Sequence, residues 1–265
     1  MDQEILSFAQ EIALEAGKIL FKGFRSDHTV ISYKSRTDIV TNIDRESEEF
    51  LYSAISKKFP NHSIIAEEGS RKDTLGDYIW YVDPLDGTNN FAHGIPFFSV
   101  SIGVYSKKKE EMTAGIVYNP VLKELFSAVH SRGAHLNDEP ISVSRIGDIG
   151  IALLATGFPY DKEDSDKNNT KEFNAFLPQI QGIRRLGSAS IDLCYVSAGR
   201  FDGYWEGGLH PWDIAAGSLI VAEAGGSVTR YDGSRFNPEH PAILATNGLI
   251  HLDMIEILSR AHGAG

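Results

Sequence analysis

The stretch Asp83-Pro84-Leu85-Asp86-Gly87-Thr88 places two carboxylates directly after a hydrophobic segment. That segment, residues 78–82, is aromatic and β-branched, which predicts a buried strand. Residues 87–90 are typical of a sharp turn and of the N-cap of a short helix. Carboxylates offer hard oxygen ligands to a cation, and helix N-terminal N–H groups bind anions, a combination that a magnesium-dependent enzyme acting on a phosphate would need. An ordinary Asp/Gly turn with one capping aspartate would use the same residue types.

Length and composition restrict the class of protein. A chain of 265 residues can bury a large core, as one domain or as two closely packed halves. Its 42% hydrophobic and 23% charged residues are those of an ordinary globular protein, which excludes disorder. The formal net charge of −11 argues against nucleic acid or an anionic membrane as the main partner. A small phosphorylated substrate is compatible with that charge, because bound cations would reverse the local sign.

The N-terminal segment, the length of the apolar runs and the cysteine content indicate the cellular compartment of the protein. Residues 1–24 are acidic and lack both a basic region and a small-residue cleavage site, so they do not resemble a secretory signal. No apolar run approaches the roughly 20 residues of a membrane span. The one cysteine, Cys194, cannot form an internal disulfide. We therefore expect a soluble, cytoplasmic protein with no membrane partner.

Hydrophobic periodicity predicts how the chain is organised. Helices are expected over residues 3–24 and 43–59, a short strand over 63–66, and a strand-rich region over 97–143. Beyond residue 150 the pattern alternates, with strands at 151–156, 183–186 and 202–205 and helices at 168–179, 189–198 and 211–224. Residues 160–170 are expected to form a flexible surface loop. A layered α/β architecture follows, with an N-terminal half over 1–150 and a C-terminal half over 151–265.

Four acidic residues lie at the edges of predicted elements. Glu67 follows one strand, Asp83 and Asp86 follow another, and Asp213 lies in the first turn of a helix. Each alone has a simpler explanation, such as a solvated turn or a favourable interaction with the helix dipole. Together they suit Mg²⁺ or Mn²⁺, with the carbonyl of Leu85 as a further oxygen ligand. Zinc is disfavoured because none of the nine histidines forms a pair at metal-binding spacing.

Three segments resemble the signatures of the inositol monophosphatase family. They are Glu67-Glu68, the run from Asp83 to Phe91, and Trp212-Asp213-Ile214-Ala215-Ala216-Gly217. Their order and spacing also match, and the resemblance runs essentially from end to end. Residues 155–159 and 185–189 resemble the bacterial branch in particular. The resemblance implies an αβαβα sandwich of the type found in inositol monophosphatases and fructose bisphosphatases, a homodimer, and a site between the two halves.

The resemblance also implies the ligands of two or three Mg²⁺ ions. The first ion would be held by Glu67, Asp83 and the Leu85 carbonyl, and the second by Asp83, Asp86 and Asp213. Glu67 would help to hold a third ion. Lithium inhibition is expected, through occupation of the more weakly held metal site. Lys34 lies in an irregular segment that resembles the family's mobile metal loop, although its spacing differs slightly.

Residue-by-residue matches imply roles in catalysis and substrate binding. Thr88, paired with Asp44, would orient the attacking water, and Glu67 would act in catalysis through the metal. The N–H groups of Gly87 and Thr88 would bind the phosphate. Glu206 would contact sugar or inositol hydroxyls. The remaining substrate-binding residues on this basis are Asp213, Gly187, Ser188 and Ala189.

The implied function is a Mg²⁺-dependent phosphomonoesterase for inositol monophosphate and related sugar phosphates. It would use activated water and no covalent intermediate. Fructose bisphosphate, histidinol phosphate and nucleotide 3′-phosphates are alternative substrates, because related sites with the same metal core handle them. An interaction or scaffold role, such as binding to transcription machinery, could coexist with catalysis.

Two other phosphatase mechanisms fit the sequence less well. Cys194 and Arg200 have the Cys-x5-Arg spacing of cysteine phosphatases, but the cysteine lies within a helical pattern and is expected to be buried. Aspartyl-phosphate enzymes usually have two aspartates separated by one residue, whereas two residues separate Asp83 and Asp86. We therefore expect neither nucleophile.

Overall fold

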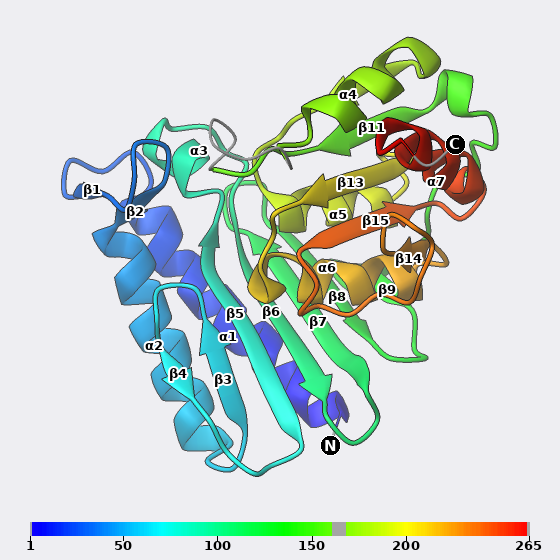
Figure 1. The fold of residues 1–265 in the computed structure, drawn as a ribbon. Helices are drawn as coiled ribbons and strands as arrows, with labels where there is room; N and C mark the ends of the chain where they lie inside the picture. Colours follow the sequence, from blue (N-terminus) through cyan, green and yellow to red (C-terminus); the bar gives the residue numbers. More distant parts are fainter. Residues whose placement is uncertain (1, 161–167, 264–265) are drawn as a thin grey trace.

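Five alternating layers of helix and sheet make up the computed structural model, which describes residues 2–160 and 168–263 (Figure 1). Two helices, α1 (Asp2–Gly23) and α2 (Asn42–Lys58), cover the outer face of a large sheet. Two more, α5 (Ala189–Ser197) and α6 (Pro211–Glu223), lie between this sheet and a smaller one. The helices α4 (Thr170–Phe176) and α7 (His251–Ala261) cover the far face of the smaller sheet. The expected αβαβα sandwich is confirmed.

The large sheet contains eight strands in the order β10-β9-β8-β7-β6-β5-β3-β4. Among the described residues, β3 and β5 are the only neighbouring strands of this sheet that run parallel to each other. All eight strands come from the part of the chain before residue 142: β3 (Ser63–Ala66), β4 (Arg71–Lys72), β5 (Tyr78–Asp86), β6 (Ser99–Ser106), β7 (Glu111–Asn119), β8 (Glu124–Val129), β9 (Ala134–Leu136) and β10 (Glu139–Ile141).

The smaller sheet contains five strands in the order β12-β11-β13-β15-β14. They are β11 (Leu153–Thr156), β12 (Gly182–Arg184), β13 (Gly203–Gly207), β14 (Ser227–Thr229) and β15 (Ala242–Thr246). The remaining elements are the hairpin β1 (Ile31–Tyr33) and β2 (Ile39–Thr41), the short helix α3 (Thr88–Ala92), and the 3₁₀ turns η1 (Ile149–Ile151) and η2 (Leu177–Gln179).

The first two helices begin and pack as their sequences predict. In α1 the buried side chains Ile5, Ala9, Ile12 and Ala16 recur every three or four residues and face the sheet. The start of α2 is fixed by a capping box, in which the Thr41 hydroxyl accepts from the first-turn N–H groups and the carboxylate at the N3 position accepts from the Thr41 N–H. The predicted helices over 3–24 and 43–59 are therefore confirmed to within a residue.

Several elements differ from the expected boundaries. The strand expected over 151–156 begins at Leu153, and the strand expected over 183–186 spans Gly182–Arg184. β5 continues through Asp86 instead of ending before Asp83, with an irregular register where Pro84 has no N–H to donate to β6. β13 extends to Gly207, so Glu206 lies within the strand. The helix expected over 168–179 ends at Phe176 and continues as the 3₁₀ turn that contains Pro178. Most of the loop expected over 160–170 lies outside the described residues.

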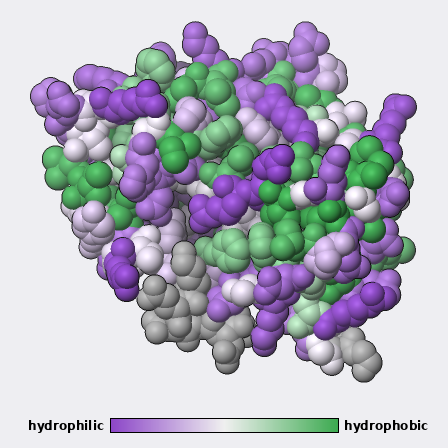
Figure 2. Space-filling view, turned by 90° about the horizontal axis from the view of Figure 1, so that it is seen from above, coloured by the Kyte–Doolittle hydropathy of each residue, from purple (hydrophilic) through white to green (hydrophobic). Residues whose placement is uncertain are grey.

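Exposed apolar side chains are dispersed. In the view from above, hydrophobic residues form patches that hydrophilic residues interrupt (Figure 2). The most exposed large ones include Tyr33 on β1, Leu75 before β5 and Leu252 on α7. In the part of the chain that the structure describes, none of the helices has the length and apolar character needed to cross a bilayer.

Helix α6 rests on a patch of the large sheet that has no side chains. Gly103 on β6 and Gly115 on β7 are cross-strand partners. A Cβ at Gly103 would lie 2.7 Å from the Cβ of Ala215, and one at Gly115 would lie 2.6 Å from the carbonyl oxygen of Ala216. The helix is buried without a break from Ile214 to Val221, as expected for a central helix that is apolar on all sides. The glycines thus let its backbone approach the sheet.

We predict that Gly115→Ala destabilises the protein. The added methyl group would meet the backbone of α6, which cannot move away as a flexible side chain can. The overpacking should lower the free energy of unfolding by about 2 kcal/mol, measured by urea denaturation. Gly147→Ala is the matched control, because no atom lies within 4 Å of the new Cβ. Equal stability of the two variants would contradict the close packing of α6.

Candidate active site

The turn after β3 carries two glutamates that the neighbouring elements hold in place. The carboxylate of Glu48 on α2 accepts from the N–H groups of Glu68 and Ser70, at 2.7 and 2.9 Å. Lys34, from the β1–β2 hairpin, reaches across this turn, with its Nζ 2.5 Å from Glu68 and 3.5 Å from Glu67. The carboxyl group of Glu67 is thereby held at the end of the strand, next to β5.

The end of β5 presents two aspartates that bond to different parts of the molecule. Asp83 Oδ1 accepts from the N–H of Leu85 at 3.0 Å. Asp86 Oδ2 accepts from the start of α5, namely from Ser188 Oγ (2.6 Å), from the N–H of Ser190 (2.8 Å) and from its Oγ (2.5 Å). Asp86 therefore joins the large sheet to a helix about 100 residues later in the chain.

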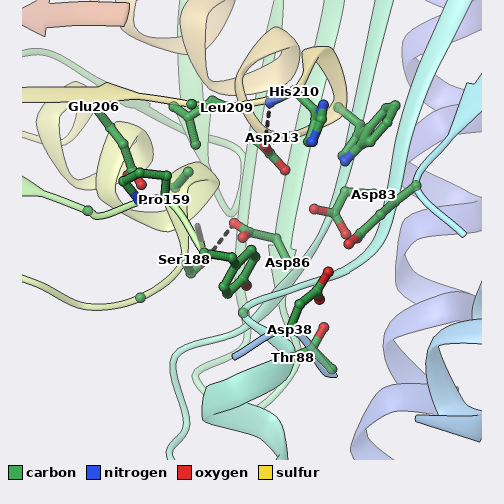
Figure 3. Close-up of a pocket in the computed structure, with 18 of the residues that line it drawn as sticks. Asp38, Asp83, Asp86, Thr88, Pro159, Ser188, Glu206, Leu209, His210 and Asp213 are labelled. Carbon is green, nitrogen blue, oxygen red and sulfur yellow. Dashed lines mark hydrogen bonds between the residues drawn. The ribbon is translucent and has the colours of Figure 1, made fainter. Parts of the chain in front are cut away.

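Asp213 approaches the same place from α6. It occupies the N3 position of the helix, and its Oδ2 accepts from the N–H of His210 at 2.7 Å. The ring of His210 stacks on Trp212, with 4.7 Å between centroids. Figure 3 shows Asp83, Asp86 and Asp213 pointing toward one common space.

A cavity of about 370 Å³ is built around this space. Apart from Asp44, every site residue expected from the sequence lines it: Glu67, Asp83, Leu85, Asp86, Gly87, Thr88, Gly187, Ser188, Ala189, Glu206 and Asp213. Asp44 lies behind the wall and contacts the cavity through Thr88. The sequence motifs, which are up to about 150 residues apart, are thus brought together in one cavity.

Burial and mutual repulsion raise the pKa values of these acids. Asp83 and Asp86 are buried, and removal from water raises the pKa of each carboxyl group above its usual range. Burial likewise raises the pKa of Glu67 to about 7, and the negative charge of Glu68 adds to this shift while Lys34 opposes it. The pKa of Asp213 is also raised, first by burial and then by the charges of Glu67 and Asp86. The site therefore concentrates acidic groups, and Lys34 pairs with the glutamates of the turn after β3.

The acidic side chains of the cavity do not have the geometry of a metal coordination shell. Among residues 2–160 and 168–263, no three acidic, histidine or cysteine side chains are already arranged to hold a metal ion. Asp83 and Glu67 instead lie close enough to influence the pKa of each other. The donor set nevertheless fits a hard cation, because it consists of carboxylate oxygens and one backbone carbonyl.

A hydroxyl group links the cavity to a buried acid. Thr88 Oγ1 lies 2.9 Å from Asp44 Oδ1 and 3.0 Å from the carbonyl oxygen of Leu85. Asp44 is fully buried, and its other oxygen accepts from the N–H and the hydroxyl group of Thr41. Burial raises the pKa of Asp44, although these hydrogen bonds oppose the shift. The α2 capping box therefore also fixes the acid that bonds to Thr88.

Glu206 lines the opposite side of the cavity from Asp83 (Figure 3). Tyr204 donates a hydrogen bond to its Oε2. A Cβ on Gly157 would lie 2.1 Å from that same oxygen, so only glycine leaves room for this carboxyl group. Burial raises the pKa of Glu206 to about 7. This role of Gly157 was not expected from the sequence, because the clash exists only once β11 and β13 are paired.

Other lining residues were not expected from the sequence. Asp38 comes from the β1–β2 hairpin, and Asp192 comes from the first turns of α5. Neither belongs to a motif, and helical periodicity alone does not say which face of α5 meets a cavity. Cys194 is fully buried in α5, as expected, and burial raises the pKa of its thiol. Both features disfavour the reactive thiolate that a cysteine nucleophile needs.

We predict that Glu206→Gln stabilises the metal-free protein at neutral pH. A carboxyl group with a raised pKa contributes full stability below its unfolded pKa of 4.5, and this contribution is lost as the pH rises toward about 7. In chelator, the variant should gain about 2 kcal/mol over wild type between about pH 5 and about pH 8, measured by urea unfolding. For the control Glu49→Gln, on the exposed face of α2, the difference in free energy of unfolding from wild type should be the same at both pH values. If the difference in free energy of unfolding between Glu206→Gln and wild type did not change with pH, Glu206 would not be a buried acid with a raised pKa.

Known proteins resemble the chain over nearly its whole length. An inositol-1-monophosphatase of Synechocystis sp. is 43% identical over 97% of this chain and 89% of its own. A Nus factor SuhB of Pseudomonas aeruginosa is 42% identical over 92% of each chain. The solved structure of inositol monophosphatase from Anabaena (Nostoc) sp. has a TM-score of 0.89 and 40% identity, covering 97% of this chain and 96% of that one. A model of the inositol monophosphatase family matches residues 1–262. The chain therefore belongs to the inositol monophosphatase family and is a phosphatase that hydrolyses phosphate monoesters.

Proposed function

We propose that the protein is a Mg²⁺-dependent phosphatase of inositol monophosphate and related sugar phosphates. The observation that carries this proposal is the convergence of Asp83, Asp86 and Asp213 on one cavity. Each of them uses one carboxylate oxygen for a hydrogen bond within the protein and has a raised pKa. Negative charge on such a site lowers the stability of the fold at neutral pH, and bound cations would balance it.

The family resemblance implies which of these residues would hold each ion. Glu67, Asp83 and the Leu85 carbonyl would hold one ion, and Asp83, Asp86 and Asp213 a second, with Glu67 helping to hold a third. Mn²⁺ could replace Mg²⁺, because both prefer oxygen ligands. When bound, such ions lower the pKa of water and stabilise negative charge on the phosphoryl oxygens. The number of ions and their identity stay predictions.

Thr88 and Asp44 would direct the proton of the attacking water. The Thr88 hydroxyl group has one hydrogen, which it can donate to Asp44 Oδ1. Its lone pairs then accept from water in the cavity, so the water is turned with an oxygen lone pair toward the substrate. A proton can pass from this water to Thr88 Oγ1 while the hydroxyl proton of Thr88 moves to Asp44. No covalent intermediate is needed.

The opposite wall would bind the rest of the substrate. Gly87 and Thr88 line the cavity, and their backbone N–H groups would donate to phosphate oxygens. Gly87 has φ 91, and a Cβ there would lie 2.9 Å from the carbonyl oxygen of Phe97, so a larger residue would disturb this corner. Glu206 would accept from sugar or inositol hydroxyls, and Gly187, Ser188 and Ala189 would border the same space. A cavity of about 370 Å³ suits a small ligand of this kind.

Other expectations remain open beside this proposal. Fructose bisphosphate, histidinol phosphate or a nucleotide 3′-phosphate is the alternative substrate. The name of the Pseudomonas relative, Nus factor SuhB, describes that protein. For this chain, an interaction with transcription machinery beside catalysis stays a hypothesis, and so do the homodimer, the cytoplasmic location and the inhibition by lithium.

A substrate panel tests the proposed function. Phosphate release should be measured with Mg²⁺ and with excess chelator, from inositol monophosphate, fructose bisphosphate, histidinol phosphate and adenosine bisphosphate. We expect release that requires Mg²⁺ and is fastest for inositol monophosphate. Faster release from fructose bisphosphate would replace the proposed substrate, and full activity in chelator would refute the metal assignment. No release from any compound would favour the interaction role.

A further inference from the structure

One acidic side chain at the cavity has no part in the functions described above. Asp192 lies in α5, one turn after Ala189, and lines the same cavity. It is only 1% exposed, and within the described residues its Oδ1 has no hydrogen-bond partner. No side-chain hydrogen bond is among the influences on its pKa, which burial raises well above the usual value. Asp192 is thus a buried carboxyl group at the edge of the cavity, and its Oδ1 accepts no hydrogen bond from the described residues.

Other buried acids in this protein do have partners. Asp86 accepts from three donors of α5, and Glu206 accepts from Tyr204. Asp202 accepts from Ser144 Oγ at 2.5 Å and from the N–H of Leu153 at 2.7 Å. An unsatisfied buried carboxyl group lowers the stability of a fold, so its presence calls for an explanation. A ligand that supplies the missing donor would provide one.

The charges around Asp192 indicate where that donor would come from. Glu206 is the group whose charge raises its pKa most after burial, followed by Asp86, while Arg185 opposes them. Arg185 is exposed at the rim of the cavity and makes no ion pair with Asp192 among the described residues. Asp192 therefore belongs to the Glu206 side of the cavity, where the alcohol part of the substrate would lie.

We propose that Asp192 is a substrate-binding residue that accepts a hydrogen bond from a hydroxyl group of a polyol phosphate. This assignment rests on the proposed function. It narrows the substrate class to phosphates whose alcohol part carries at least two free hydroxyl groups. Glu206 would bind one of them and Asp192 the other. A substrate without the second hydroxyl would leave the carboxyl group unpaired and would bind more weakly, which is how such sites discriminate.

Two substitutions test this assignment by removing and by keeping the acceptor. Asp192→Ala removes it, whereas Asp192→Asn keeps an acceptor oxygen in nearly the same volume. For inositol monophosphate, the alanine variant should raise KM at least about tenfold with a smaller effect on kcat, and the asparagine variant should recover most of the loss. Inorganic phosphate has no alcohol part, so its inhibition constant should change by less than about threefold in both variants.

Thermal unfolding distinguishes substrate binding from a structural role. Because no hydrogen bond within residues 2–160 and 168–263 reaches Asp192 Oδ1, Asp192→Ala should unfold at a temperature no lower than that of wild type. The matched control is Asp202→Ala, a buried acid outside the cavity wall that holds Ser144 and Leu153. It should lower the unfolding temperature by several degrees without changing the ratio of KM to the phosphate inhibition constant.

Two outcomes would overturn the inference. One is a lower unfolding temperature for Asp192→Ala with an unchanged ratio of KM to the phosphate inhibition constant, which would give Asp192 a role in stability only. The other is an equal rise in KM and in the phosphate inhibition constant, which would place Asp192 at the phosphate. The proposed function fails separately, if the wild-type enzyme releases no phosphate from any polyol phosphate.

Discussion

The constraint on which the rest of this structure depends is the burial of several carboxyl groups around one cavity. Asp83, Asp86 and Asp213 come from two elements that the fold must bring together, β5 and α6. Each is held by at least one hydrogen bond from the backbone, which fixes its position in spite of the repulsion between them. The hydrogen bonds from α5 to Asp86 also join the two halves of the sandwich.

The packing of α6 shows how the fold meets this constraint. Its backbone lies against two facing glycines of the large sheet, and its first turn delivers Asp213 to the cavity. The irregular register of β5 at Pro84 allows Asp83 and Asp86 to face the same space. Local features that weaken regular structure, namely two glycines and a proline in strands, are therefore the ones that build the site.

Sequence patterns predicted the helices well because caps and periodicity are local signals. The capping box at Thr41 and the apolar spacing of α1 are visible without any tertiary information. The extension of β5 through Asp86 was missed, because Pro84 and Gly87 signal a turn and only pairing with β6 shows a strand. The last strands and helix, β14, β15 and α7, were not anticipated at all.

The candidate site could be predicted only as far as its motifs reach. Glu67, Asp83, Asp86 and Asp213 lie in segments that resemble a family, so their meeting at one cavity followed from the resemblance and not from their spacing. Asp192 and Gly157 carry no such signal. Their importance depends on which face of α5 meets the cavity and on how closely β11 approaches β13, and both are tertiary facts.

The most direct test of the account is thermal unfolding of wild type and Asp86→Asn with increasing Mg²⁺ near neutral pH. If cations balance the buried carboxylates, Mg²⁺ should raise the wild-type unfolding temperature by several degrees and then saturate, because a ligand at about 100 times its Kd adds about 2.7 kcal/mol. Asp86→Asn should respond much less, because it lacks one ligand charge. An unfolding temperature of wild type that does not respond to Mg²⁺, or an equal response of both proteins, would contradict the account.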